Sequence, residues 1–343
     1  MNCRTEEDLS FTAVHKEGEP ILRIGLALLV AFCQSAFSSA AISGSTNLVS
    51  DRLSLVLVVG AAGEDEYGSN FVHQAELWVR AGARADCRPI VIGLDAGNST
   101  NDCERFKHTL ELEPKEGPGQ LWLVLIGHGT FDGKEARFNL RGPDVSASDL
   151  AQWLRAFRRP VIVLDTSACS APFLNKLSAT NRVIVTATRS GHEQYFTRFG
   201  QALAEAIGNP QSDLDKDGQV SLLEAFLTAS RQTSEFYKTE GRLATEHALL
   251  DDNGDGLGTP AEWFSGLRAT RAPADKARMD GMWARQLYLI PGEEERSLAP
   301  EQRARRDSLE RAVFLLRDKK DRMEEDSYYR ELEKVLSELA RCY

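Results

Sequence analysis

Two stretches of the chain, residues 213–224 and 251–262, place oxygen-bearing residues at alternate positions around a glycine. Calcium takes six to eight oxygen ligands, and a twelve-residue loop supplies them if it turns sharply at position six. The ligand positions are Asp213, Asp215, Asp217, Gln219, Ser221 and Glu224 in the first stretch, and Asp251, Asn253, Asp255, Leu257, Thr259 and Glu262 in the second. Gln219 and Leu257 would contribute backbone carbonyls. The sequence therefore predicts two Ca²⁺ sites.

The ends of both stretches carry signals for a following helix. Ser221 with Glu224, and Thr259 with Glu262, have the spacing of a capping box, so the residues that close each loop would also begin a helix. With a helix over residues 222–240 between the loops, the pattern is that of an EF-hand pair.

The two loops differ at position eight, where paired calcium loops are normally coupled through a short strand pairing. This position is the apolar Val220 in the first loop and Gly258 in the second. Because glycine is a poor strand residue, we expect the second loop to bind calcium more weakly.

A histidine and a cysteine follow two apolar runs that have the composition of buried strands. Residues 121–126 lead into His128, and residues 161–164 lead into a polar turn that contains Cys169. If these strands are neighbours in a parallel sheet, the two side chains meet at its carboxyl edge. An adjacent imidazole activates a thiol for attack on a carbonyl, and the N–H groups of Gly129 and Cys169 would serve as oxyanion donors.

An alternation of short strands and helices would position these residues. Strands are predicted at residues 53–59, 90–94, 121–126, 161–164 and 183–186, because each run is short and rich in Val, Ile and Leu. Helices are predicted at residues 73–81, 102–112, 147–157, 172–177 and 199–207. Right-handed crossovers would place helices on both faces of the sheet. We therefore expect residues 51–207 to form a three-layer α/β sandwich with a mostly parallel sheet.

Within this region the sequence resembles the legumain-like cysteine peptidases, which have a caspase-like fold. The resemblance covers about residues 53–205 and depends on residues 68–76 (GSNFVHQAE), residues 127–129 (GHG) and the strand end that carries Cys169. It implies a cysteine-type endopeptidase, a hydrolase of peptide bonds. Cys169 would be the nucleophile, His128 the base and then the acid, and Asn70 the group that orients the imidazole. His73 matches a family residue near the substrate pocket.

Two places depart from the family pattern. Val72 replaces the arginine that shapes an asparagine-selective pocket, so selectivity for asparagine is not implied. At the nucleophile, counting from the strand end selects Ser167, counting back from Ser170 selects Ala168, and the local Ala-Cys pair selects Cys169. A misplacement of about 1 Å impairs catalysis heavily. Two hypotheses therefore stay open: an active peptidase with a peptide or protein substrate, and a catalytically inactive calcium-binding scaffold or interaction module.

The N-terminus has the features of a secretory signal peptide. Arg23 precedes the apolar residues 24–33, and small residues follow through Ala40. The acidic residues before Arg23 form an atypical extension. We expect residues 1–40 to be a cleaved leader and the protein to be exported, to the periplasm or the extracellular space, where calcium is plentiful. The alternative is a retained anchor, in which case the leader is the contact with the membrane.

Cysteine usage agrees with export. Beyond the leader, Cys87 and Cys103 flank a strand and a loop and are candidates for a disulfide, although spacing does not determine connectivity. Cys169 would then be unpaired, and a free thiol in an oxidising compartment calls for a reason.

The overall composition is that of a globular protein with one large domain and an appendage. The chain has 343 residues, of which 27% are charged and 42% hydrophobic, and a net charge of −10 without a basic stripe, which excludes nucleic acid as an expected partner. Residues 208–264 hold the loop pair. Residues 265–343 are highly charged with apolar positions at helical spacing, which predicts a C-terminal helical hairpin.

Overall fold

The structure, a computed structural model, describes residues 52–95, 101–274 and 278–342, so the predicted signal peptide lies outside the described residues. A central sheet has the strand order β10-β9-β8-β7-β3-β1-β2. Its strands are β1 (Ser54–Val59), β2 (Ile90–Ile92), β3 (Leu121–Ile126), β7 (Val161–Asp165), β8 (Arg182–Thr186), β9 (Leu249–Asp251) and β10 (Thr259–Pro260). The predicted strands are β1, β2, β3, β7 and β8, and they pair in parallel. The prediction of a mostly parallel sheet is confirmed.

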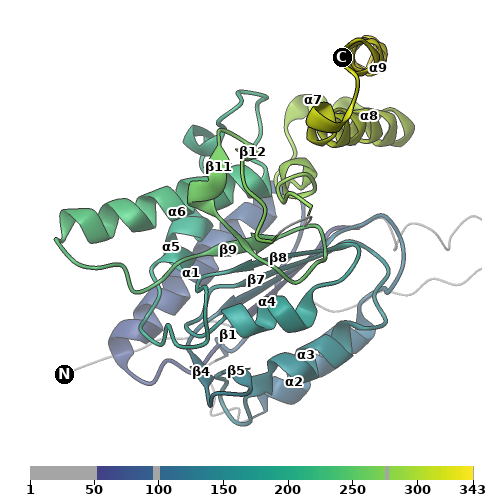
Figure 1. Cartoon of the computed structure of the whole chain (residues 1–343). Coiled ribbons are helices and arrows are strands. Elements are labelled where there is room, and N and C mark those ends of the chain that lie inside the picture. The colour runs from purple at the N-terminus through teal and green to yellow at the C-terminus, as the bar shows by residue number, and fades with distance from the viewer. Residues whose placement is uncertain (1–51, 96–100, 275–277, 343) are drawn as a thin grey trace, which may run out of the picture. The chain divides into compact units, whose positions relative to one another are not determined.

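Helices cover both faces of this sheet (Figure 1). One face packs against α1 (Asp65–Arg84), α5 (Phe199–Ala206) and α6 (Leu222–Thr239), and the other against α2 (Asp102–Leu112), α3 (Ala147–Leu154) and α4 (Ala171–Leu177). Trp78 and Phe226 are buried on the first face, and Phe106 and Phe173 on the second. Strands β1, β3 and β7 are buried along nearly their whole length, and their nearly continuous apolar side chains contribute to the cores on both faces.

Two features of this layer were not predicted. Helix α1 begins at Asp65 rather than at residue 73, so Asn70 and His73 are both helical. A small antiparallel sheet follows His128 and consists of β4 (Gly129–Phe131), β5 (Ala136–Phe138) and β6 (Val145–Ser146). These strands have two or three residues each, which is too short to give a clear alternation of apolar and polar side chains.

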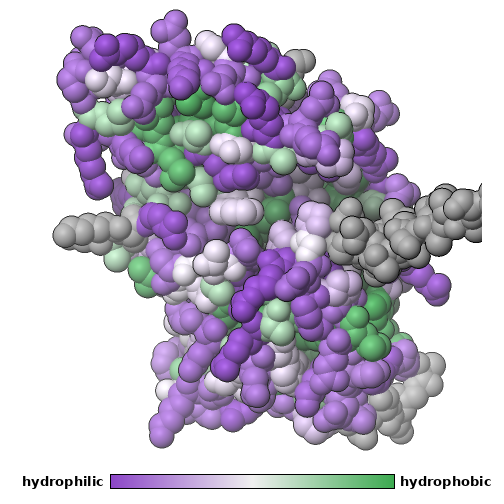
Figure 2. Space-filling view, turned by 90° about the vertical axis from the view of Figure 1, so that its right-hand side faces the viewer, coloured by the Kyte–Doolittle hydropathy of each residue, from purple (hydrophilic) through white to green (hydrophobic). Residues whose placement is uncertain are grey.

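The C-terminal part is helical only from Glu293 onward. It contains α7 (Glu293–Ser297), α8 (Pro300–Asp318) and α9 (Glu325–Leu339), and α8 packs against α9 as a hairpin. Apolar side chains form a band over these helices, at the top of Figure 2, with hydrophilic side chains around it. Before them lie β11 (Phe264–Ser265), β12 (Arg268–Ala269) and three single turns, η1 (Pro210–Ser212), η2 (Ala261–Trp263) and η3 (Ala284–Gln286). A fourth turn, η4 (Lys320–Arg322), lies between α8 and α9. The expectation of a hairpin from residue 265 was therefore too broad. Within the described ranges, no helix is both long enough and apolar enough to span a membrane.

Candidate functional site

The chain segments after β3 and β7 lie in contact at the carboxyl edge of the sheet. The two strands are parallel neighbours, with Leu125 opposite Asp165. A Cβ placed on Gly129 would lie 2.2 Å from Ala168 O and 3.0 Å from Ser167 Oγ, so only glycine permits this approach. The predicted meeting of the two strand ends is thus present in the structure.

His128 is held in an aromatic surrounding on this edge. Its ring packs edge-on against Tyr67 at 4.7 Å and Phe71 at 5.1 Å between centroids. Its Nε2 lies 3.2 Å from Ala62 O. Because a carbonyl only accepts, Nε2 must carry the proton in this bond. The orientation of His128 therefore comes from Ala62 and two aromatic rings of α1.

Cys169 lies in the turn after β7 but is not arranged as an activated nucleophile. Its side chain is 1% exposed, and its backbone has a φ of 57°, in the left-handed region. Its N–H donates to Glu193 O at 2.9 Å, so this amide is already occupied and is not a free oxyanion donor. Burial, with a smaller contribution from the charge of Asp165, raises the pKa of the thiol to about 11. Among the described residues, no hydrogen bond joins Cys169 to His128.

No hydrogen bond joins Asn70 to His128 among the described residues. Its Nδ2 donates to Glu66 O at 3.1 Å, one turn back along α1. His73 is exposed on the same helix and borders a surface hollow of about 650 Å³. The structure therefore brings together the chain segments of His128 and Cys169, but it does not join the three predicted catalytic residues through hydrogen bonds.

Ser167, the alternative nucleophile position, is occupied by a local hydrogen-bond arrangement. It is fully buried, and its Oγ and N–H donate to Asp165 Oδ1 at 2.6 and 3.1 Å. The second oxygen of Asp165 has no hydrogen-bond partner within the described ranges, and burial raises the pKa of this carboxyl to about 7. The pair closes the turn after β7 and leaves Ser167 Oγ inaccessible to a substrate.

The first calcium-type loop has its acidic side chains drawn together. Ligand atoms of Asp213, Asp215 and Glu224 all lie within 4.8 Å of one another. Asp213 Oδ2 accepts from Gly218 N at 3.1 Å, and Gly218 has a φ of 86°, as the turn at position six requires. Burial, followed by the charge of Glu224, raises the pKa of Asp215 to about 6.

Glu224 is the residue that closes this loop. It is 1% exposed, and its Oε1 accepts from Leu214 N at 2.7 Å. Its Oε2 accepts from the N–H and the hydroxyl of Ser221, both at 2.8 Å, which is the predicted capping box at the start of α6. The helix thereby brings position twelve back over position one.

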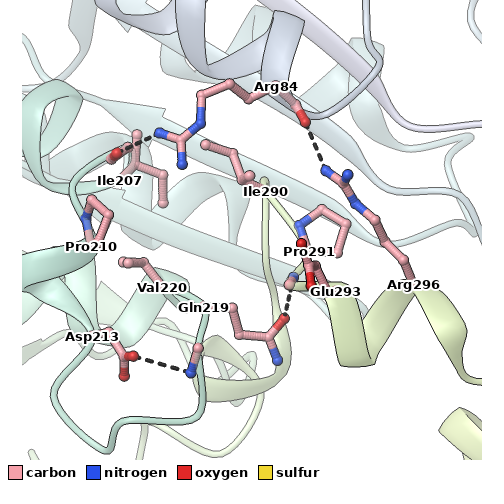
Figure 3. Close-up of a pocket in the computed structure, with 13 residues that line it drawn as sticks. Arg84, Ile207, Pro210, Asp213, Gln219, Val220, Ile290, Pro291, Glu293 and Arg296 are labelled. Atoms are coloured by element: carbon pink, nitrogen blue, oxygen red, sulfur yellow. Dashed lines mark hydrogen bonds between the residues drawn. The ribbon is translucent and has the colours of Figure 1, made fainter.

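The partner of the first loop is a segment of the same chain, residues 287–292, which we call the strap. Ser221 forms a bridge with Tyr288, and Leu222 N donates to Leu287 O at 2.8 Å. Gly292 N donates to Gln219 Oε1 at 3.0 Å, as Figure 3 shows. Tyr288 OH donates to Asp217 Oδ2 at 3.4 Å. The strap leads directly into α7.

A cavity of about 470 Å³ lies beside the strap and the first loop. Val220, Ile290 and Pro291 line it, and the side chains of Arg84 and Arg296 border it (Figure 3). Each of these arginines donates to a backbone carbonyl, Arg84 to Gly208 O and Arg296 to Arg84 O. Arg296 thus links α7 to the end of α1.

The second calcium-type loop takes a different form. Asp251 Oδ1 and Oδ2 accept from Gly254 N at 3.0 Å and Gly256 N at 3.1 Å, which resembles the first loop. The flanking residues, however, form β9 and β10, which extend the central sheet next to β8. The prediction of a helix after this loop was wrong, because the sheet edge pairs with the segment that would begin it.

Two predicted ligands of the second loop have other surroundings. Thr259 is a strand residue whose Oγ1 donates to Asp280 Oδ2 at 2.6 Å, and Glu262 is exposed in η2. Within the described ranges, Asp213, Asp215 and Glu224 form the one acidic group compact enough to hold a metal ion. The two loops do not pair with each other, since one pairs with the strap and the other with β8. The predicted EF-hand pair is therefore not formed.

The sequence did not predict a buried pair of carboxyls, Asp252 in the second loop and Asp280. Asp252 accepts from Gly281 N, Trp283 N and Ala284 N at 2.7 to 3.0 Å, and its own N–H donates to Asp280 Oδ1 at 3.0 Å. Burial, followed by the charge of Asp252, raises the pKa of Asp280 to about 9. The two residues are distant in sequence, and Asp252 falls between the ligand positions, so no local signal was available.

The four described cysteines that follow the predicted leader are free, which corrects the candidate disulfide. Cys87 is buried and Cys103 is half-buried on α2. Cys87 Sγ lies 3.5 Å from Leu53 O.

Comparisons with known proteins give no family for this chain. No family model matches the sequence, and no curated protein matches it. Caspase-1 from Spodoptera frugiperda is similar in structure with a TM-score of 0.38 and 9% identity, over 60% of this chain and 88% of that chain. The Drosophila initiator caspase Dronc has a TM-score of 0.39 and 13% identity, over 63% and 86%. A protein from Geobacter sulfurreducens has a TM-score of 0.38 and 11% identity, over 58% and 92%. Scores this low carry no argument about function.

Proposed function

We propose that this protein is a calcium-binding protein without peptidase activity, and that one Ca²⁺ binds in the first loop. The observation that supports this most directly is the convergence of Asp213, Asp215 and Glu224, whose ligand atoms lie within 4.8 Å of one another. Carboxylates this close repel each other, and a divalent cation turns that repulsion into attraction. The turn at Gly218 and the carbonyl of Gln219 complete a ligand set that suits a hard cation.

The loop would then act as a structural joint. Gln219 and Ser221 contact the strap, and Glu224 caps the start of α6. Bound Ca²⁺ supplies positive charge at this joint. The contacts of the loop connect it to both the strap and α6. Because Ca²⁺ would stabilise the loop, it would also stabilise the attachment of the C-terminal helices that follow the strap.

The non-catalytic alternative is preferred because of the surroundings of the predicted nucleophile. Thiolate is the reactive form of cysteine, and a thiol with a pKa of about 11 is almost entirely protonated at neutral pH. Cys169 is also buried and has no hydrogen bond to His128 within the described ranges. Ser167 donates to Asp165 and is fully buried. These surroundings therefore favour a structural role for Cys169 and Ser167.

A calcium titration of the full chain by isothermal calorimetry, paired with thermal unfolding in calcium and in EGTA, tests the proposal. We expect one site and a higher Tm in calcium, since a ligand that binds only the folded state stabilises it. The absence of binding heat together with an unchanged Tm would overturn the proposal. Two equivalent sites would restore the prediction of a loop pair.

Alkylation of Cys169 by iodoacetamide tests the absence of an activated thiol. The rate is measured against pH in the native protein and in a His128→Ala variant, and the modified cysteine is identified by mass spectrometry. We expect slow modification near neutral pH that does not depend on His128. A fast reaction that slows in the variant would support the peptidase hypothesis instead.

A further inference from the structure

A groove of about 410 Å³ lies beside the first calcium-type loop. Leu214 and Asp215 of that loop form one part of its lining. The turn between β11 and β12 contributes Leu267, and α8 contributes Val313 and Phe314. Three segments that are distant in sequence thus enclose a single surface feature, which no local pattern could reveal.

Three arginines border this groove and form no salt bridge within the described ranges. They are Arg268, Arg285 and Arg317. No salt bridge or side-chain hydrogen bond engages their guanidinium groups within the described ranges, whereas Arg303 and Arg306 of the same region pair with Glu295. Guanidinium groups bind carboxylates through planar, two-point contacts. Asp215 and Glu310 also line the groove, and Arg268 interacts electrostatically with Asp318. The lining itself holds three guanidinium groups against two carboxylates, which leaves an excess of one positive charge on a chain of net charge −10.

The groove also has an apolar lining. Leu214 is 45% exposed although it follows the first ligand of the loop. Phe314 and Leu267 are half-buried in the same lining. An apolar hollow with a cationic rim fits a chain segment that inserts one bulky apolar side chain and places acidic residues on either side.

We propose that this groove binds an acidic peptide segment of a partner protein, with a bulky apolar side chain seated against Leu214, Leu267 and Phe314, and that calcium in the first loop strengthens this binding. The proposal that the groove binds a peptide depends on the groove residues alone. The calcium dependence rests on the proposed function.

The link to calcium is the position of Asp215. This carboxylate faces both the metal cluster and the groove, and Arg285 is close enough to interact with it electrostatically. When Asp215 is engaged by a cation, its negative charge no longer offsets Arg285. The groove then presents a larger positive charge to an incoming acidic segment, and binding becomes stronger.

Fluorescence anisotropy of a labelled pentapeptide tests the proposal. The probe is Asp-Glu-Phe-Glu-Asp, added to the full chain in excess calcium and in EGTA, with Asp-Glu-Gly-Glu-Asp as the matched peptide without an apolar anchor. The groove variant is Arg268→Glu with Arg317→Glu. Arg155→Glu, an exposed arginine at the end of α3 with no ion pair in the described part of the chain, is the matched control. Calcium calorimetry on each variant verifies that the loop is intact.

We expect the phenylalanine peptide to bind, and its Kd to rise at least tenfold in the groove variant but less than twofold in Arg155→Glu. The glycine peptide should bind at least fivefold more weakly, and EGTA should raise the Kd severalfold. Equal Kd values in the two variants, equal binding of both peptides, or displacement by low millimolar inorganic phosphate would overturn the groove as a peptide site. Calcium binding without any effect of EGTA on the peptide would overturn the link alone. Peptide binding without calcium binding would overturn the proposed function and leave the groove in place.

Discussion

The two calcium-type loops have the same ligand pattern and different structures. In both, the aspartate at position one accepts hydrogen bonds from N–H groups of its own loop, including the glycine at position six. In the first loop, α6 brings Glu224 back against Asp213 and Asp215. In the second, the chain continues into β10, and Glu262 stays exposed. Loop geometry is thus local, whereas the position of the closing ligand depends on the helix or strand that comes after the loop.

The difference shows that the ligand pattern forms a metal site only when the residue at position twelve lies on a helix that follows the loop. A helix after position nine returns position twelve toward the metal, because residues three apart lie on the same face of a helix. A strand at this position extends away from the loop. Sheet pairing with β8 through β9 outcompeted the helix signal of Thr259, Pro260 and Glu262.

The largest contrast between the loops should appear on neutralising position twelve. Glu224→Gln keeps an oxygen that accepts from Ser221 but removes the charge, so we expect calcium affinity to fall about 100-fold, on the order of 3 kcal/mol. Glu262→Gln should change it less than twofold. Calorimetry measures both. Equal losses in the two variants would mean that both loops bind calcium.

Calcium removal should loosen the surroundings of one loop only. At a calcium concentration 100 times the Kd, bound calcium contributes about 2.7 kcal/mol. We expect hydrogen exchange in EGTA to rise in the strap and at the start of α6, and to stay unchanged in β9 and β10. A uniform rise across both regions would contradict a local role for calcium.

Replacing the hydroxyl at position nine separates metal binding from packing. Thr259→Val leaves a buried oxygen of Asp280 without its donor, so we expect a loss of about 1–3 kcal/mol in the free energy of unfolding and no change in calcium affinity. Ser221→Ala removes a helix cap, which costs about 1 kcal/mol, and should weaken calcium binding as well. Chemical denaturation in EGTA, followed by calorimetry, distinguishes the two. Weaker calcium binding in Thr259→Val would show that the second loop takes part.

The smallest expected effect concerns the glycines at position six. Gly218 and Gly256 have φ values of 86° and 76°, and a Cβ at either meets nothing closer than 3.8 Å. Alanine at either should therefore cost about 1 kcal/mol in EGTA, from backbone strain alone. In calcium, Gly218→Ala should lose more, because the strained turn also carries the ligands. Thermal unfolding of both variants in calcium and in EGTA measures these losses. Equal losses of stability for Gly218→Ala and Gly256→Ala in calcium would contradict a calcium site in the first loop alone.

At the carboxyl edge of the sheet, as in the second loop, the sequence predicted the elements but not the positions of the side chains that follow them. Apolar runs predicted β1, β3, β7 and β8 because their burial is continuous, and the parallel order then placed His128 near the turn that holds Ser167 and Cys169. The sequence could not indicate the rotation of that turn. A left-handed backbone at Cys169 and a bond from Ser167 to Asp165 leave neither side chain accessible. The start of α1 at Asp65 likewise placed Asn70 where its amide bonds its own helix.

By itself, the sequence determined the parallel sheet, its flanking helices and the local turns of both loops. Each of these depends on neighbouring residues or on a continuous apolar run. Tertiary structure decided the partner of each loop, the strap for the first and β8 for the second. It also decided the pairing of Asp252 with Asp280 and the assembly of the arginine groove. These contacts join residues that are distant in sequence, and their free energy depends on which segments the folded core brings within reach.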